Sequence, residues 1–183
     1  MRIIFFQTIF RRSFILFCGM ILILFNKPVL SQADSVKTSA WKITIPTKEE
    51  PGEPLIVAGT VYAPDGKTPA TGVSVYVYHT DVEGYYRKGN NSSSNPRLKG
   101  MMVTNAEGKY EFRTIKPGAY PGGGNPAHIH YILSGKGYAE QHDEVMFQGD
   151  PYLTPQSRPY ARPLQRGQDG IWRCVFDLKL KQK

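Results

Sequence analysis

The feature that most constrains this sequence is its series of short apolar runs, each of which ends in turn-forming residues. Residues 55–63 are rich in β-branched side chains and lead into Pro64-Asp65-Gly66, which is a turn signal. In residues 72–79, valines alternate with tyrosines, and this two-residue period is typical of a strand. No apolar 3.6-residue period extends over a helix-length window, so we expect an all-β fold.

The remaining apolar runs predict further strands at residues 109–115, 128–134, 144–147 and 170–180. Residues 105–108 are expected to form a hairpin-like turn before the first of these. Short strands with frequent turns are typical of sandwiches and barrels, and 14 Pro with 18 Gly agree with such a chain. We therefore predict a single-domain β-sandwich with long active-site loops at residues 87–99, 117–127 and 149–169.

Residues 1–33 have the layout of a cleaved signal peptide. A segment with three arginines precedes the apolar residues 13–25, and Ser31-Gln32-Ala33 offers a cleavage site. The apolar run is shorter than the roughly 20 residues that cross a bilayer, so we expect no stable membrane anchor after cleavage. The protein is predicted to be secreted or periplasmic. Arg11-Arg12 leaves both twin-arginine export and ordinary secretion open.

The mature chain is expected to comprise an N-terminal arm, residues 34–53, and a sandwich domain, residues 54–183. Of 23 basic and 15 acidic residues, four basic and no acidic ones lie in residues 1–33. The remaining positive excess is small and forms no basic stripe, which excludes nucleic acid as a partner. Cys174 is the only cysteine left after cleavage, so no internal disulfide can form, and we expect it to be an inert core residue.

His128 and His130 form the first candidate for a functional site. Alternate residues of a strand lie on one face, so the two imidazoles would lie side by side while Ile129 faces the opposite layer. Imidazole is the commonest side-chain metal ligand. Taken alone, the pair is equally consistent with two surface histidines on a half-exposed strand.

Several motifs along residues 55–151 resemble those of the intradiol ring-cleavage dioxygenases, and more closely the protocatechuate 3,4-dioxygenase branch. They are Gly84-Tyr85-Tyr86, Pro117-Gly118-Ala119-Tyr120-Pro121, Pro126-Ala127-His128-Ile129-His130-Tyr131 and Phe147-Gln148-Gly149-Asp150-Pro151. The resemblance implies a non-haem Fe(III) enzyme that cleaves a small catecholic aromatic between its two hydroxylated carbons with O2. It also allows an oligomeric assembly.

By this resemblance, the side chains that hold the ferric ion would be Tyr86, Tyr120, His128 and His130. Tyr85 competes with Tyr86, which we prefer because it lies two residues after Gly84. The resemblance further implies that Tyr120 leaves the ion and accepts a substrate proton. Hard anionic oxygens favour Fe(III), and a bound cation favours the phenolate form. Zinc more often combines His with Cys or a carboxylate, and the sequence does not place that combination near these residues.

The sequence departs from the family pattern at three places. Asn125 stands where the family usually has Arg, Glu144 where it has Gln, and Gly122 where a Trp is common. We include Asn125 and Glu144 among the catalytic candidates, although both changes make the surroundings less favourable to a developing oxyanion. A buried, protonated Glu144 would reduce this effect. Four basic residues could replace the charge of the family's arginine: Arg87, Arg97, Lys116 and Arg162. Residues of this kind are more often solvated surface charges.

These departures leave two alternatives to an active dioxygenase. One is a catalytically weakened or inactive domain that binds an aromatic ligand, and the other is a metal-free sandwich of the carbohydrate-binding or adhesion type. The other two histidines are expected to be structural: His79 packs or forms a hydrogen bond at a strand end, and His142 is exposed. We assign to sheet packing the tyrosines Tyr76, Tyr78, Tyr110 and Tyr131.

Overall fold

The computed structural model describes residues 40–45, 50–90 and 92–183. The predicted signal peptide, residues 1–33, and the first residues of the predicted arm lie outside these ranges. Within them, no helix combines the length and the hydropathy needed to cross a membrane. The described residues belong to one structural unit, Lys37–Lys183.

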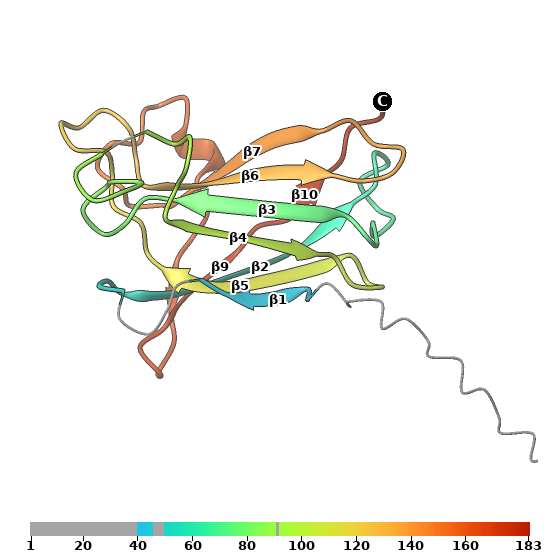
Figure 1. Cartoon of the computed structure of the whole chain (residues 1–183), viewed down its shortest axis with the longest axis horizontal. Helices are drawn as coiled ribbons and strands as arrows, with labels where there is room; N and C mark the ends of the chain where they lie inside the picture. Colours follow the sequence, from blue (N-terminus) through green and yellow to red (C-terminus); the bar gives the residue numbers. More distant parts are fainter. Residues whose placement is uncertain (1–39, 46–49, 91) are drawn as a thin grey trace, which may run out of the picture. The chain divides into compact units, whose positions relative to one another are not determined.

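The strands of the described residues form two β-sheets, as predicted (Figure 1). The strands of the larger sheet are β1 (Lys42–Thr44), β2 (Pro54–Tyr62), β5 (Lys109–Ile115), β8 (Gln165–Arg166), β9 (Trp172–Val175) and β10 (Leu178–Lys179). Those of the smaller sheet are β3 (Ser74–His79), β4 (Leu98–Val103), β6 (His128–Ser134) and β7 (Gln141–Met146). A short 3-10 helix, η1 (Arg158–Tyr160), lies between β7 and β8.

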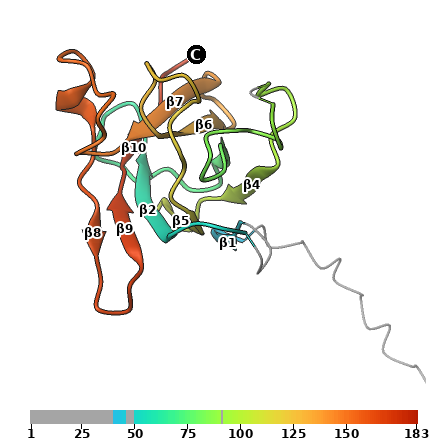
Figure 2. The ribbon, with the colours of Figure 1, turned by 90° about the vertical axis from the view of Figure 1, so that its left-hand side faces the viewer.

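The order of the larger sheet is β1-β5-β2-β9-β8, with β10 paired to β2, and that of the smaller sheet is β4-β3-β6-β7. The β8–β9 hairpin extends from the edge of the larger sheet (Figure 2). Strand β6 is central to the smaller sheet, since it pairs antiparallel with both β3 and β7. The histidine motif therefore lies on a strand that is fixed from both sides.

Alternating side chains of the strands fill the space between the sheets. Ile129 and Tyr131 of β6 are fully buried there. The ring of Tyr131 meets that of Tyr110 from the larger sheet, with centroids 6.0 Å apart. Cys174 is also buried in this core, and burial raises the pKa of its thiol to about 11. The all-β fold and the core position of Cys174 are thus confirmed.

The predicted strand 170–180 is interrupted at Phe176 and Asp177, which separate β9 from β10. Both pieces pair parallel with β2. At the break, the Thr60 N–H donates to the Asp177 carboxylate at 2.8 Å instead of to a backbone carbonyl. The Phe176 carbonyl accepts from the Tyr110 hydroxyl at 2.5 Å. Side-chain hydrogen bonds therefore replace backbone hydrogen bonds between the strands at this point, and the predicted strand is split into β9 and β10.

Three strands were not expected from the sequence. Strand β4 lacks a β-branched alternation and forms by pairing with β3, while β1 pairs with β5 from within the predicted arm. Strand β8 lies in the predicted loop 149–169. The predicted turn at residues 105–108 is present, with the Gly108 N–H donating to the Asn105 carbonyl at 3.0 Å. It closes no hairpin, because the strands on either side, β4 and β5, lie in different sheets. Strand β7 begins at Gln141, before the expected residue 144.

Candidate metal centre

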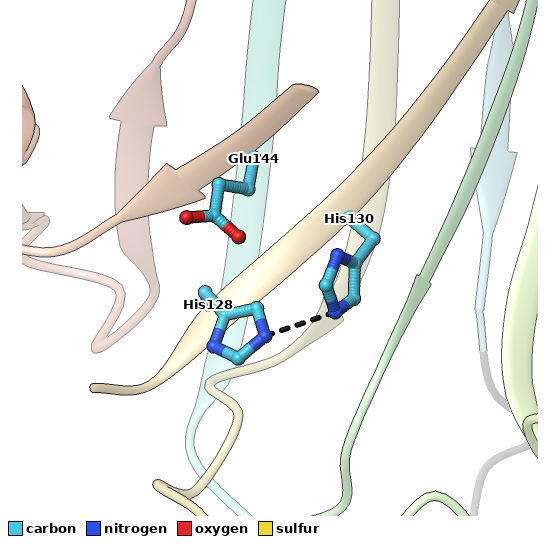
Figure 3. Close-up of side chains that lie close together, drawn as sticks. All are labelled: His128, His130 and Glu144. Carbon is cyan, nitrogen blue, oxygen red and sulfur yellow. Dashed lines mark hydrogen bonds between the residues drawn. The ribbon is translucent and has the colours of Figure 1, made fainter. Parts of the chain in front are cut away.

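Strand β6 presents two imidazoles on the face of the smaller sheet that points away from the core. Ile129 between them is fully buried, as the two-residue period requires. The two Nε2 atoms of His128 and His130 lie 2.9 Å apart, and the rings are perpendicular (Figure 3). The expected same-face arrangement of the two histidines is present.

Two loops bring a tyrosine each to this pair. The loop after β3 carries Tyr86, and the loop before β6 carries Tyr120. The loops touch backbone to backbone: a Cβ on Gly84 would overlap the Ala119 carbonyl oxygen, and one on Gly118 would overlap the Val82 carbonyl oxygen. Gly84 also has a φ of +85°, which disfavours other residues. The glycines of both motifs thus permit the close approach.

Asp81 holds the two loops in place. Its carboxylate accepts the backbone N–H groups of Glu83 and Tyr85 at 3.0 and 2.9 Å. Its backbone carbonyl accepts the N–H groups of Gly84 and Gly118 at 3.1 and 2.8 Å. A single residue therefore fixes both tyrosine-bearing segments.

The donor atoms of the four side chains form a closed ring of contacts. The hydroxyl of Tyr86 lies in very short contact with that of Tyr120 and 2.7 Å from His130 Nε2. The Tyr120 hydroxyl lies 3.3 Å from His128 Nε2. Together with the imidazole pair, two phenol oxygens and two imidazole nitrogens converge on one point.

The four side chains carry too few hydrogen atoms to make every one of these four contacts a hydrogen bond. The His128 Nδ1 lies 2.7 Å from the Pro126 carbonyl, so in a neutral ring Nδ1 carries the proton and Nε2 offers a lone pair. At most three hydrogens, from two phenols and His130, then serve four contacts. A cation at the centre removes this mismatch, and fixing of the far ring nitrogen by a carbonyl is typical of metal-bound histidine. The donor set fits a ferric ion.

Burial governs protonation when no metal is bound. It raises the pKa of Tyr86, and the hydrogen bond to Tyr120 raises it further. Burial lowers the pKa of His130 to about 4, and the neighbouring His128 adds to this shift. The phenol therefore keeps its proton and the imidazole stays neutral near pH 7. A bound cation must displace the phenol protons.

A cavity of about 210 Å³ opens beside the four donors. Both catalytic candidates, Asn125 and Glu144, line it, together with Tyr120, His128 and His130. Tyr86 is only 2% exposed, so Tyr120 is the phenol that faces the cavity. The volume suits a small aromatic ring, since the clefts that hold larger, drug-sized ligands measure about 300–1,000 Å³.

The carboxylate of Glu144 points towards the two imidazoles (Figure 3). The ligand atoms of His128, His130 and Glu144 all lie within 4.8 Å of one another. The expectation that no carboxylate accompanies these histidines is therefore wrong. It failed because His130 and Glu144 become neighbours only when β6 pairs with β7.

None of the four candidate cations lines this cavity. Arg97 pairs with Glu50 and Asp81. Lys116 lies over the Trp172 ring and Arg162 over the Phe176 ring, while Arg87 is exposed. Among the residues that the structure describes, the lining of the cavity therefore contains no arginine or lysine.

The other two histidines are located as expected. His79 is fully buried and lies 2.7 Å from both the Thr80 carbonyl and the Thr114 hydroxyl. The side chain of His142 is 69% exposed. Neither one takes part in the ring of donors.

Sequence reasoning missed two residues that position the donors. Tyr78 was assigned to sheet packing, yet its ring stacks on His130 with centroids 4.6 Å apart, and this depends on the pairing of β3 with β6. The Asp150 carboxylate accepts the Ala127 N–H at 3.0 Å and so fixes the chain directly before His128. The Phe147–Pro151 motif contained this aspartate, but only the fold assigns it a role.

A family model described as a dioxygenase matches residues 27–162. The match covers more than half of the chain, and the chain belongs to the intradiol ring-cleavage dioxygenase family. The predicted family is thereby confirmed.

Two curated relatives illustrate the similarity. Catechol 1,2-dioxygenase 1 of Acinetobacter lwoffii is 31% identical over 144 residues, which cover 69% of this chain and 46% of that protein. The protocatechuate 3,4-dioxygenase beta chain of Burkholderia cepacia is 34% identical over 124 residues, which cover 62% and 52%. The chain thus spans about half the length of these relatives. Because both types match, the closer likeness to the protocatechuate branch stays a prediction.

A solved structure with the same fold is the dioxygenase domain of a dioxygenase–carbohydrate-binding protein fusion from Streptomyces sp. SirexAA-E. Its TM-score to this chain is 0.62 at 27% identity, and the match covers 76% of this chain and 87% of that one. The described sandwich thus corresponds to most of a solved dioxygenase domain.

Proposed function

We propose that this protein is a non-haem Fe(III) intradiol dioxygenase that cleaves a catecholic ring between its two hydroxylated carbons with O2. The observation that carries the proposal is the convergence of the Tyr86, Tyr120, His128 and His130 donor atoms at one point beside a small cavity. The proteins it resembles include catechol and protocatechuate dioxygenases. A ferric ion held by these side chains would supply Lewis acidity to the bound catechol.

The surroundings of the two phenols support different roles for them. Tyr86 is almost fully buried and suits a permanent ligand. Tyr120 lines the cavity and suits the ligand that leaves and accepts a proton from an incoming substrate. The Asn125 amide and the Glu144 carboxylate would face the reacting ring from the same cavity.

The test combines metal analysis, a visible spectrum and oxygen uptake. We expect about one iron per chain, a phenolate-to-iron absorption band, and O2 consumption with one or more of a panel of catechols. Tyr120→Phe should abolish the uptake, and Tyr160→Phe, an exposed tyrosine that does not line this cavity, should not. A colourless protein with no stoichiometric iron would contradict the proposal.

A binding module without turnover is the second candidate. It is favoured by a cavity whose described lining contains Asn125 and Glu144 but no basic side chain, which is a poor setting for a developing oxyanion. A coloured, iron-loaded protein that binds catechols but consumes no O2 would establish this alternative.

We also propose that the mature protein is secreted or periplasmic. The support is the signal-peptide layout of residues 1–33. Mass spectrometry of the exported protein should find Asp34 at its N-terminus. An intact N-terminus on protein recovered from the cytoplasm would contradict this proposal.

A further inference from the structure

Glu144 lies beside the four-donor centre, yet that centre does not need it. Strand pairing places it directly opposite His130, and its carboxylate oxygen lies within 4.8 Å of the ligand nitrogens of both histidines (Figure 3). In the described ranges this carboxylate has no hydrogen bond or ion pair. The Glu144 side chain is exposed and can turn towards a cation.

The separations suit ligands of a single ion. Metal bonds to imidazole nitrogen and carboxylate oxygen are about 2.0–2.2 Å long, so two ligand atoms of one ion lie at most about 4 Å apart. A small rotation of the exposed Glu144 side chain covers the difference. Two histidines and one carboxylate are a common ligand set for zinc and for divalent iron.

Charge balance points the same way. Two phenolates leave one positive charge of a ferric ion uncompensated. The carboxylate of Glu144 would neutralise it, and a neutral centre is favoured beside the nearly buried side chains of Tyr86 and His128.

We propose that Glu144 is a fifth ligand side chain of this centre, and that His128, His130 and Glu144 can hold a divalent cation without the two tyrosines. The inference rests on the proposed function only in assuming that these side chains form a metal site. An incoming catechol would then have to displace the Glu144 carboxylate. This requirement would distinguish the chain from family members that have a neutral Gln side chain at this position.

Cobalt(II) is the probe, because it replaces zinc and has a visible spectrum that reports coordination. It is titrated into the Tyr86→Phe/Tyr120→Phe double variant, which keeps both imidazoles and Glu144. We expect one Co²⁺ per chain. Adding Glu144→Gln should weaken binding at least tenfold, which corresponds to about 1.4 kcal/mol.

Glu140→Gln is the matched control. Glu140 is an exposed glutamate just before β7, paired with His142 at 3.5 Å, and it does not line the cavity. Its substitution should leave the Co²⁺ affinity within twofold, and thermal unfolding of each variant verifies that it is folded.

Equal Co²⁺ affinities of the double variant with and without Glu144→Gln would overturn the inference, as would a folded double variant that binds no Co²⁺. Ferric loading of the wild-type protein, followed by its visible band, separates the two proposals. If the wild type binds iron but Glu144→Gln has no effect, only the inference fails. If the wild type takes up neither metal, both fail.

Discussion

Adjacent tyrosines in this chain have different surroundings. The Tyr86 hydroxyl contacts Tyr120 and His130, whereas Tyr85 contributes its backbone groups to the turn around Asp81. Alternation along an extended segment separates their side chains. The preference for Tyr86 over Tyr85 agrees with this geometry, and its role as a ligand stays a prediction.

Substitution of each tyrosine distinguishes them. Tyr86→Phe should lower iron affinity at least tenfold and remove most of the visible absorption, because a phenolate donor is lost. Tyr85→Phe should retain both. Iron content and the visible spectrum are the measurements, and an unchanged spectrum in Tyr86→Phe would exclude it as a ligand.

His79 couples stability to pH. Burial lowers the pKa of His79 in the folded protein to about 4, from an ordinary value of 6.5. Between pH 6.5 and pH 4, His79 is protonated in the unfolded chain but stays neutral in the folded protein. The free energy of unfolding therefore falls by about 1.4 kcal/mol for each pH unit as the pH is lowered through this range. Above pH 6.5 this residue has no effect.

Urea unfolding between pH 7 and pH 4 measures that slope. His79→Phe should reduce the dependence of the unfolding free energy on pH by about 1.4 kcal/mol per pH unit. His142→Phe, at an exposed position, should not change this dependence. Identical slopes for the wild type and His79→Phe would contradict the assignment.

The two tyrosine-bearing loops depend on one close backbone contact. Gly84→Ala adds a methyl group that overlaps the Ala119 carbonyl at a positive φ. The loops must separate, so we expect a loss of about 2 kcal/mol or more in unfolding free energy and a loss of iron binding.

Gly89→Ala is the control for backbone conformation. Gly89 also has a positive φ, +67°, but a Cβ there meets no atom of the described residues within 4 Å. It should cost about 1 kcal/mol and leave the iron content unchanged. Normal iron binding by Gly84→Ala would show that the loop contact does not position the tyrosines.

Across the whole molecule, the candidate centre joins strand β6 to the loop that follows β3 and to the loop that precedes β6. A ligand that binds only the folded state stabilises it by mass action, by about 4 kcal/mol at a thousandfold excess over its Kd. Iron should therefore raise the melting temperature by about 10 °C.

Calorimetry of the iron-loaded and chelator-treated protein tests this expectation. Tyr86→Phe/Tyr120→Phe/His130→Ala provides the control, since it should show no shift on addition of iron. Equal melting temperatures for the two wild-type forms would mean that iron binds weakly or that the donors do not converge in solution.

The sequence by itself determined the local features. The two-residue period of β-strands follows from backbone sterics, so the common face of His128 and His130 and the burial of Ile129 could be predicted from their spacing. The motifs also identified the family, because glycines and tyrosines at fixed spacing reflect local turns. Strand β4, which has no such pattern, could not be found this way.

The tertiary structure decided which distant segments meet. Tyr78 stacks on His130 and Glu144 lies beside it because β3, β6 and β7 pair in one particular register. The same holds for Asp150 and Ala127 and for the division between β9 and β10. Strand pairing is a long-range choice made by burial of the whole core, and local sequence patterns do not encode it.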